Sequence, residues 1–168
     1  MTKAPALLAP LALALSACGL HPMYQGGSGG TVASTLAAVE VAPIEGQSGW
    51  LVTNALKDRL DNRGTAAAYR LEVRLDDRII GLGVRRDDSV SRERRTLRAR
   101  YQLIDVRNGQ VVLDATAGSD AGIDVVGSEY ATIAAEKSAL ERLSGIVADQ
   151  IVARIARYVR NGGTPPAQ

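Results

Sequence analysis

The sequence predicts an α+β fold, a two-layer sandwich in which a four-stranded mixed sheet carries two helices on one face. Three observations support this prediction. A short strand, a helix and another strand follow one another early in the chain, an order that usually forms a right-handed parallel crossover. Segments of alternating polarity come next, separated by turn signals, which predicts an antiparallel meander. One long amphipathic helix closes the chain, so the element order is β-α-β-β-β-α.

The first strand and helix open the expected domain, residues 36–161. The strand spans residues 36–43 and has valines at alternate positions. Ser48 could cap a helix that runs to about Asn62, and Gly64 suits a left-handed position after its end. The apolar face of this helix carries Val52, Ala55, Leu56 and Leu60.

The second strand begins at Tyr69 and continues through Ile79 and Ile80. Gly81 and Gly83 predict a bulge or bend near its end. Residues 85–88 (RRDD) are expected at the tip of the following hairpin. Apolar residues alternate with charged ones along the strand, which predicts one buried and one polar face. The apolar positions are Tyr69, Leu71, Val73 and Leu75.

The return strand and the last strand have the same alternation. Asn108-Gly109 predicts a two-residue hairpin turn between them, because both residues tolerate positive φ. The apolar positions are Leu97, Ala99, Tyr101 and Leu103 in the return strand, and Val111, Leu113, Ala115 and Ala117 in the last strand.

The closing helix is expected from about Ser128 to Arg160. Glutamates lie early in it and arginines late, which suits the helix dipole. Its apolar stripe is weakened at Ser144-Gly145. Asn161-Gly162-Gly163 should end the helix, and residues 162–168 are expected to form a disordered tail. The stripe consists of Ile133, Leu140, Leu143, Val147, Ile151 and Ile155.

The first residues have the layout of a secretory signal, with a positive charge, a short apolar stretch and small residues before a cysteine. Leu15-Ser16-Ala17-Cys18 resembles a bacterial lipobox. The expectation is therefore a lipoprotein signal peptide over residues 1–17, with acyl chains such as palmitate on Cys18. Residues 18–35 would be the lipidated N-terminus and a flexible tether, since 25–35 are rich in Gly, Ser and Thr. The alternative is a signal peptide that ends near an unmodified cysteine.

Composition argues against several function classes. The formal net charge is only +2, so no strong overall field attracts nucleic acid. His21 is the only histidine and lies on the expected tether, and no Cys/His spacing suits a metal. Pairs such as Glu40 with Glu45, or Asp87 with Asp88, are better explained as surface charges than as acid/base pairs. The sequence therefore predicts neither an enzyme nor a cofactor.

An arginine-rich stretch is the one polar feature above background. Residues 85–107 contain eight arginines against four carboxylates, a local net charge of +4. Arginine suits bidentate contact with phosphate, so an anionic ligand or partner is one interpretation and a solvated outer face is the other. Arg95 falls on the opposite strand face. The candidate contact residues are Arg85, Arg86, Arg92, Arg94, Arg98 and Arg100.

The segment Cys18-Gly19-Leu20-His21-Pro22-Met23-Tyr24 resembles the start of mature proteins of the LPS-assembly lipoprotein LptE family. Later patterns agree in order along the chain. They are Gly49, Val52 and Leu56 in the helix, Tyr69, Leu71 and Val73 in the next strand, Arg98, Tyr101, Leu103 and Asp105 in the return strand, and Tyr130-Ala131 at the start of the last helix.

The resemblance implies a non-enzymatic protein anchored by lipid on the periplasmic side of the outer membrane. LptE-like proteins plug an LptD β-barrel, help it to fold and assist lipopolysaccharide delivery. The resemblance also suggests lipopolysaccharide binding through basic residues. Gly19 agrees with the outer membrane, because an aspartate there tends to retain enterobacterial lipoproteins at the inner membrane. Two alternatives remain open: an auxiliary lipoprotein of a periplasmic lipid-transport system, and a lipid-anchored hydrolase.

Overall fold

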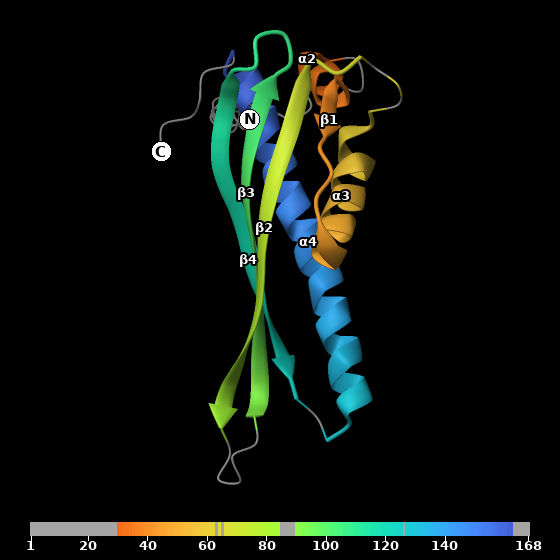
Figure 1. Cartoon of the computed structure of the whole chain (residues 1–168), viewed down its shortest axis with the longest axis vertical. Coiled ribbons are helices and arrows are strands. Elements are labelled where there is room, and N and C mark those ends of the chain that lie inside the picture. Colours follow the sequence, from red (N-terminus) through yellow and green to blue (C-terminus); the bar gives the residue numbers. More distant parts are fainter. Residues whose placement is uncertain (1–29, 63, 65, 85–89, 126, 163–168) are drawn as a thin grey trace, which may run out of the picture.

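A four-stranded mixed sheet and three helices make up the described part of the chain (Figure 1). The computed structural model describes residues 30–62, 64, 66–84, 90–125 and 127–162. The predicted α+β class and the mixed sheet are confirmed. In chain order the elements are α2 (Thr31–Ala37), β1 (Val39–Val41), α3 (Gly46–Leu60), β2 (Tyr69–Val84), β3 (Val90–Asp105), β4 (Val111–Asp124) and α4 (Glu129–Arg160).

The sheet has the order β1-β2-β3-β4. β1 pairs in parallel with β2 over three residues only, and α3 makes the crossover between them. β2, β3 and β4 form the antiparallel meander that the alternation predicted. These three strands continue well beyond β1 and α3, and only α4 accompanies them to the far end (Figure 1).

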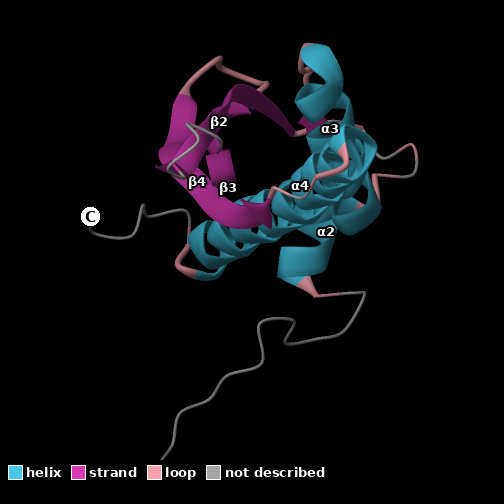
Figure 2. Cartoon of the chain, turned by 90° about the horizontal axis from the view of Figure 1, so that it is seen from below, coloured by secondary structure: helices cyan, strands magenta, loops and turns pink. Residues whose placement is uncertain are grey.

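Helix α4 is the centre of the helical layer. Viewed from below, the sheet curves and α4 lies against it, with α3 on one side of α4 and α2 on the other (Figure 2). The helix begins where the sequence predicted, and Ser128 caps it: the Ser128 hydroxyl accepts a hydrogen bond from the Ala131 N–H at 3.4 Å. Five residues of the predicted stripe, from Leu140 to Ile155, are buried, but Ile133 is 42% exposed. The predicted burial of Ile133 is therefore wrong. At the end of the domain where α4 begins, α2 and α3 are absent and do not cover this residue (Figure 1).

Helix α2 is an element that the sequence did not predict. It starts at Thr31, so residues 31–35, expected as flexible tether, are helical and the strand is confined to Val39–Val41. Val32 and Leu36, one helical turn apart, are both buried in the main core. This burial accounts for a helix in a segment whose composition suggested none.

The ends of α3 also differ from the sequence prediction. Glu45 is the N-cap residue and Ser48 lies inside the first turn, so Ser48 is not the cap. At the other end Asp61 adopts the left-handed conformation with φ of 50°. Gly64 also has positive φ, but it lies beyond the cap. The predicted apolar positions Val52, Leu56 and Leu60 are fully buried, and Ala55 packs beside them.

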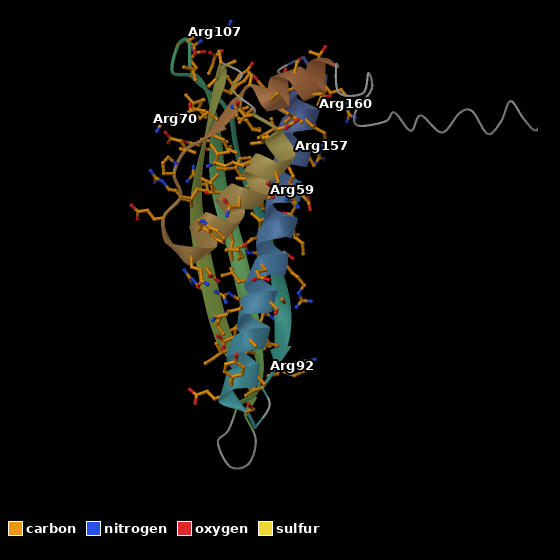
Figure 3. The ribbon with its side chains drawn as sticks, turned by 90° about the vertical axis from the view of Figure 1, so that its right-hand side faces the viewer. Arg59, Arg70, Arg92, Arg107, Arg157 and Arg160 are labelled. Atoms are coloured by element: carbon orange, nitrogen blue, oxygen red, sulfur yellow. The ribbon has the colours of Figure 1, made fainter. Side chains whose placement is uncertain are left out.

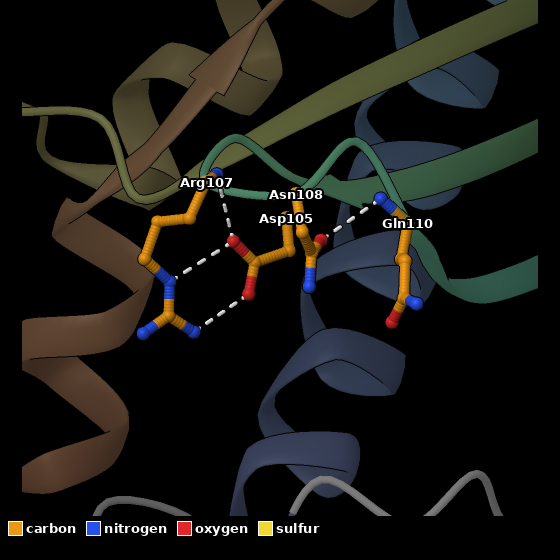
Figure 4. Close-up of polar contacts among 4 residues, drawn as sticks. All are labelled: Asp105, Arg107, Asn108 and Gln110. Atoms are coloured by element: carbon orange, nitrogen blue, oxygen red, sulfur yellow. Dashed lines mark hydrogen bonds and ion pairs between the residues drawn. The ribbon is translucent and has the colours of Figure 1, made fainter.

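The loop between β3 and β4 is longer than the predicted two-residue turn. Five residues, 106–110, connect the strands, and of Asn108-Gly109 only Gly109 has positive φ. The Asp105 carboxylate closes the loop by accepting from the Arg107 backbone N–H at 2.9 Å and from its guanidinium at 2.7 and 3.1 Å (Figure 4). These bonds hold the pKa of Asp105 below its usual value. A buried carboxylate therefore selects the wider loop.

The expected bulge near Gly81 and Gly83 is absent from the described pairs. Gly81 lies opposite Glu93 and Val84 opposite Val90, in the same register as the rest of the ladder. The predicted hairpin tip, 85–88, lies outside the described residues, as does the expected disordered tail beyond residue 162.

Arg95 of β3 forms an ion pair with β2 and a hydrogen bond to α4 in the far half of the sheet. The Arg95 guanidinium donates to both carboxylate oxygens of Asp77, at 2.9 and 2.7 Å, and to the Glu136 carbonyl at 3.1 Å. The side chains of Arg95 and Asp77 are only 13% and 19% exposed. Arg95 thus faces the helix, as its strand parity predicted, and it has a structural partner there.

Replacing Asp77 by asparagine is expected to lower the free energy of unfolding by about 2 kcal/mol, because the sheltered guanidinium loses a charged acceptor. Chemical denaturation would measure the change. The matched control is Asp76→Asn, since Asp76 pairs with Arg78 but is 52% exposed. That change should stay within about 0.5 kcal/mol. Equal effects of the two substitutions would contradict the structural role of this ion pair.

Candidate functional site: the arginine-bearing face of the sheet

The sheet face turned away from the helices carries the described arginines of the predicted set. Alternation along β3 points Arg92, Arg94, Arg98 and Arg100 outward while Leu97, Ala99, Tyr101 and Leu103 are buried. Charged side chains occur along the length of the sheet, with Arg70 near one end and Arg92 near the other (Figure 3). The strand parity of these four arginines is as the sequence indicated.

Two of the four arginines have carboxylate partners on β4. Arg92 Nε lies 3.0 Å from Asp124 Oδ1, its direct neighbour in the ladder. Arg100 Nη2 lies 3.1 Å from Asp114 Oδ2, which also accepts from Gln102 at 2.9 Å. These bonds hold the pKa of Asp114 below its ordinary value, Arg100 contributing most. The charges of Arg92 and Arg100 are therefore largely compensated within the sheet.

Arg94 and Arg98 make no ion pair among the described residues, and neither does Arg74 on the neighbouring strand. Arg74 lies directly opposite Arg100 in the β2–β3 ladder. Like charges in direct cross-strand contact destabilise a sheet unless a counter-charge intervenes. The three arginines Arg74, Arg98 and Arg100 line one hollow of about 700 Å³. Asp76 also lines this hollow, but its carboxylate pairs with Arg78 at 2.8 Å. Among the described residues of the face, the hollow is therefore the place that best suits an anion.

Gly118 makes room for Arg98 in this hollow. The two residues are direct neighbours in the β3–β4 ladder. A Cβ added to Gly118 would lie 2.6 Å from Arg98 Cδ and 3.0 Å from the Leu97 carbonyl oxygen. The Arg98 stem therefore lies flat across the β4 backbone. A side chain at position 118 would push it away.

Sequence reasoning missed Arg74 as a member of this site. Its outward orientation follows from alternation, but its place opposite Arg100 depends on a register that one strand does not reveal. Of the other predicted site residues, Cys18, Arg85 and Arg86 lie outside the described residues. So do Asp87 and Asp88, while Glu40 and Glu45 are exposed.

The described residues contain no group of His, Cys, Asp or Glu side chains placed to hold a metal ion. None of the described helices is long and apolar enough to cross a bilayer.

The description "Lipopolysaccharide-assembly" (LptE) belongs to a family model that matches residues 36–155. Among solved structures, a candidate lipoprotein of Caulobacter crescentus is 25% identical with a TM-score of 0.67, over 77% of this chain and 96% of that one. An uncharacterized lipoprotein B of Nitrosomonas europaea is 14% identical, with a TM-score of 0.55 over 75% and 90% of the two chains. The rare lipoprotein B of Shewanella oneidensis is 16% identical, with a TM-score of 0.52 over 73% and 95%. No curated protein sequence matches the chain.

Proposed function

Because the chain belongs to the LptE lipopolysaccharide-assembly family, we propose that it is a lipoprotein anchored through Cys18 to the periplasmic side of the outer membrane. There it plugs an LptD-like β-barrel and assists the assembly of lipopolysaccharide at the outer membrane. The role is non-enzymatic: the domain acts by occupying the barrel and by contacting its cargo. The family match and the lipoprotein neighbours support this proposal.

The observation that carries the barrel proposal is the long polar face of the sheet. The lumen of a large outer-membrane barrel is itself polar, so a plug needs a polar surface rather than an apolar patch. The outward residues of β2, β3 and β4 supply such a surface along strands of 14 to 16 residues. Only α4 accompanies the strands at the far end of the sheet (Figure 1), and we propose that this end leads the domain into the lumen.

A stable one-to-one complex with an LptD-like barrel is expected when the tagged lipoprotein is purified from solubilised envelopes. Photo-cross-linkers at Arg98, on the outward face, and at Arg86, in the expected hairpin tip, should react with the barrel. A cross-linker at Ala139 is the matched control, because this residue is fully buried against the core. If no barrel co-purifies and the cross-links lead to an inner-membrane transporter, the auxiliary-lipoprotein alternative replaces this proposal.

We also propose that the arginines of the outward face contact lipopolysaccharide phosphates. Arg94 and Arg98 carry uncompensated charge, and Arg74 and Arg100 face one another beside the same hollow. Arg92, Arg85 and Arg86 would extend the contact toward the hairpin. Exposed cations of this kind bind anions through interactions that salt screens over about 10 Å at 0.1 M.

The variant Arg74→Glu/Arg94→Glu/Arg98→Glu is expected to bind lipopolysaccharide at least about tenfold more weakly, which corresponds to about 1.4 kcal/mol. Binding to detergent-dispersed lipopolysaccharide, measured as a function of salt, checks this. Lys137→Glu/Arg142→Glu/Arg160→Glu is the control, because it changes the net charge equally at exposed cations on α4, away from the hollow. Unchanged binding by the first variant, or equal loss in both, would reject a defined arginine site.

A further inference from the structure

A second groove lies between strand β4 and the C-terminal half of α4. Its volume is about 1160 Å³, and its floor includes the small residues Ala115 and Ala153. The other residues around it are polar: Arg100, Tyr101, Asp114, Thr116, Asp149, Gln150, Arg154 and Arg157. This groove is bordered on one side by the free edge of the sheet, and it shares Arg100, Thr116 and Gln150 with the hollow on the outward face.

The edge of β4 presents backbone donors and acceptors to this groove. β4 is the last strand in the sheet order, so only one of its sides is paired. The Gly118 N–H donates to Gln150 Oε1 at 2.9 Å, and its carbonyl accepts from Gln150 Nε2 at 3.3 Å, so Gly118 faces away from β3. Every second residue of an edge strand points its backbone N–H and C=O to the unpaired side, so Asp114 and Thr116 also point these groups away from β3.

The Gln150 amide shows what this edge accepts. One N–H of this amide donates to the Gly118 carbonyl, and the amide oxygen accepts from the Gly118 N–H. A residue of a neighbouring strand would make the same two hydrogen bonds. The side chain therefore occupies one position of a missing fifth strand and limits that strand on the Gly118 side. Residues 114–116 of β4 border the open part of the groove.

The groove also has uncompensated positive charge. The carboxylates that line it already have partners, since Asp114 binds Arg100 and Asp149 binds Arg59 at 2.5 Å. Arg154 and Arg157 make no ion pair among the described residues, and Arg154 Nε is buried without a hydrogen-bond partner there. Figure 3 shows Arg157 near the C-terminal end of α4.

We propose that this groove binds an extended, acidic segment of a partner protein, which pairs with β4 at residues 114–116 as a fifth strand. Backbone hydrogen bonds to Asp114 and Thr116 supply the pairing. Side chains of an added strand alternate between its two faces, so carboxylates at every second position can meet Arg154 and Arg157. The inference goes beyond the proposed function, because it depends neither on the outward-face arginines nor on the identity of the barrel.

The test uses the full chain in detergent and a synthetic capped peptide in which glutamate alternates with valine. Binding should slow amide hydrogen exchange at Asp114 and Thr116 by at least about tenfold, as expected for backbone groups that become paired. A peptide with the same sequence but N-methylated at alternate residues lacks the pairing donors. A peptide with lysine in place of glutamate has the wrong charge. Both should bind at least about tenfold more weakly.

The protein side is tested with Arg154→Gln/Arg157→Gln, which should weaken peptide binding by at least about tenfold. Arg160→Gln is the control on the same helix, because Arg160 is exposed and does not line the groove. If the N-methylated peptide binds as well as its parent and no amide is protected, strand pairing is wrong. Inorganic phosphate is then added at the same concentration as the peptide carboxylates. If it displaces the peptide, the groove is a simple anion site and the proposal is overturned.

Discussion

Replacing Leu140 by alanine is expected to lower the free energy of unfolding by about 2–5 kcal/mol, the usual cost of truncating a buried leucine. Leu140 lies on α4 and is 1% exposed. It belongs to the cluster in which α4 packs against the sheet, α2 and α3. Helix α4 contacts β3, β4, α2 and α3, so a cavity at Leu140 weakens several of these contacts together. Chemical denaturation monitored by circular dichroism measures the change.

Ile133→Ala is the matched control, because Ile133 lies on the same helix but is 42% exposed. The sequence placed both residues in one apolar stripe. The structure separates them, so the control should change stability by less than about 0.5 kcal/mol. A small effect at Leu140, or a large one at Ile133, would mean that the packing of α4 differs from that described.

The fate of Ile133 illustrates what periodicity can predict. Helical spacing identified the face of α4 that points toward the sheet, and the buried residues from Leu140 to Ile155 confirm it. Spacing does not reveal how far the opposing layer extends. At the start of α4 the other helices are absent, and Ile79 of β2 is also 40% exposed there (Figure 1). Burial at that end depends on long-range packing.

Two of the local errors, the missed helix α2 and the predicted tight turn, have a similar origin. The composition of residues 25–35 favoured a flexible chain, but Val32 and Leu36 gain burial against the domain, and helix α2 forms. Asn108-Gly109 favoured a tight turn, but Asp105 gains three hydrogen bonds from Arg107 in the wider loop. In both segments contacts outside the short sequence pattern outweigh the local preference.

The sequence was sufficient to predict which sheet face carries the arginines of the candidate site, but not which of them form ion pairs. Alternation in β3 was sufficient to place Arg92, Arg94, Arg98 and Arg100 on one face. Which of them keep an uncompensated charge depends on Asp124 and Asp114, which lie 32 and 14 residues away along the chain. The edge groove could not be predicted at all, because it requires the position of α4 relative to β4.

Replacing Cys18 by alanine is expected to release the protein from the membrane. The reason is that the proposed acyl chains are its only proposed anchor, and each buried methylene contributes about 0.8 kcal/mol of membrane affinity. Density fractionation of envelopes should find the parent in the outer-membrane fraction and the variant in the soluble periplasmic fraction. Intact mass of the parent should show residues 1–17 removed and lipid on Cys18.

The same substitution separates anchoring from folding. The buried core of the described domain begins at Val32, well after Cys18, so the released variant should unfold at the same denaturant concentration as the delipidated parent. It should also still bind an LptD-like barrel in detergent if the sheet face makes that contact. An unmodified parent that begins elsewhere than at Cys18 would reject the anchor. A released variant that no longer binds the barrel would instead assign the lipid a direct part in the complex, because the folded surface would be unchanged.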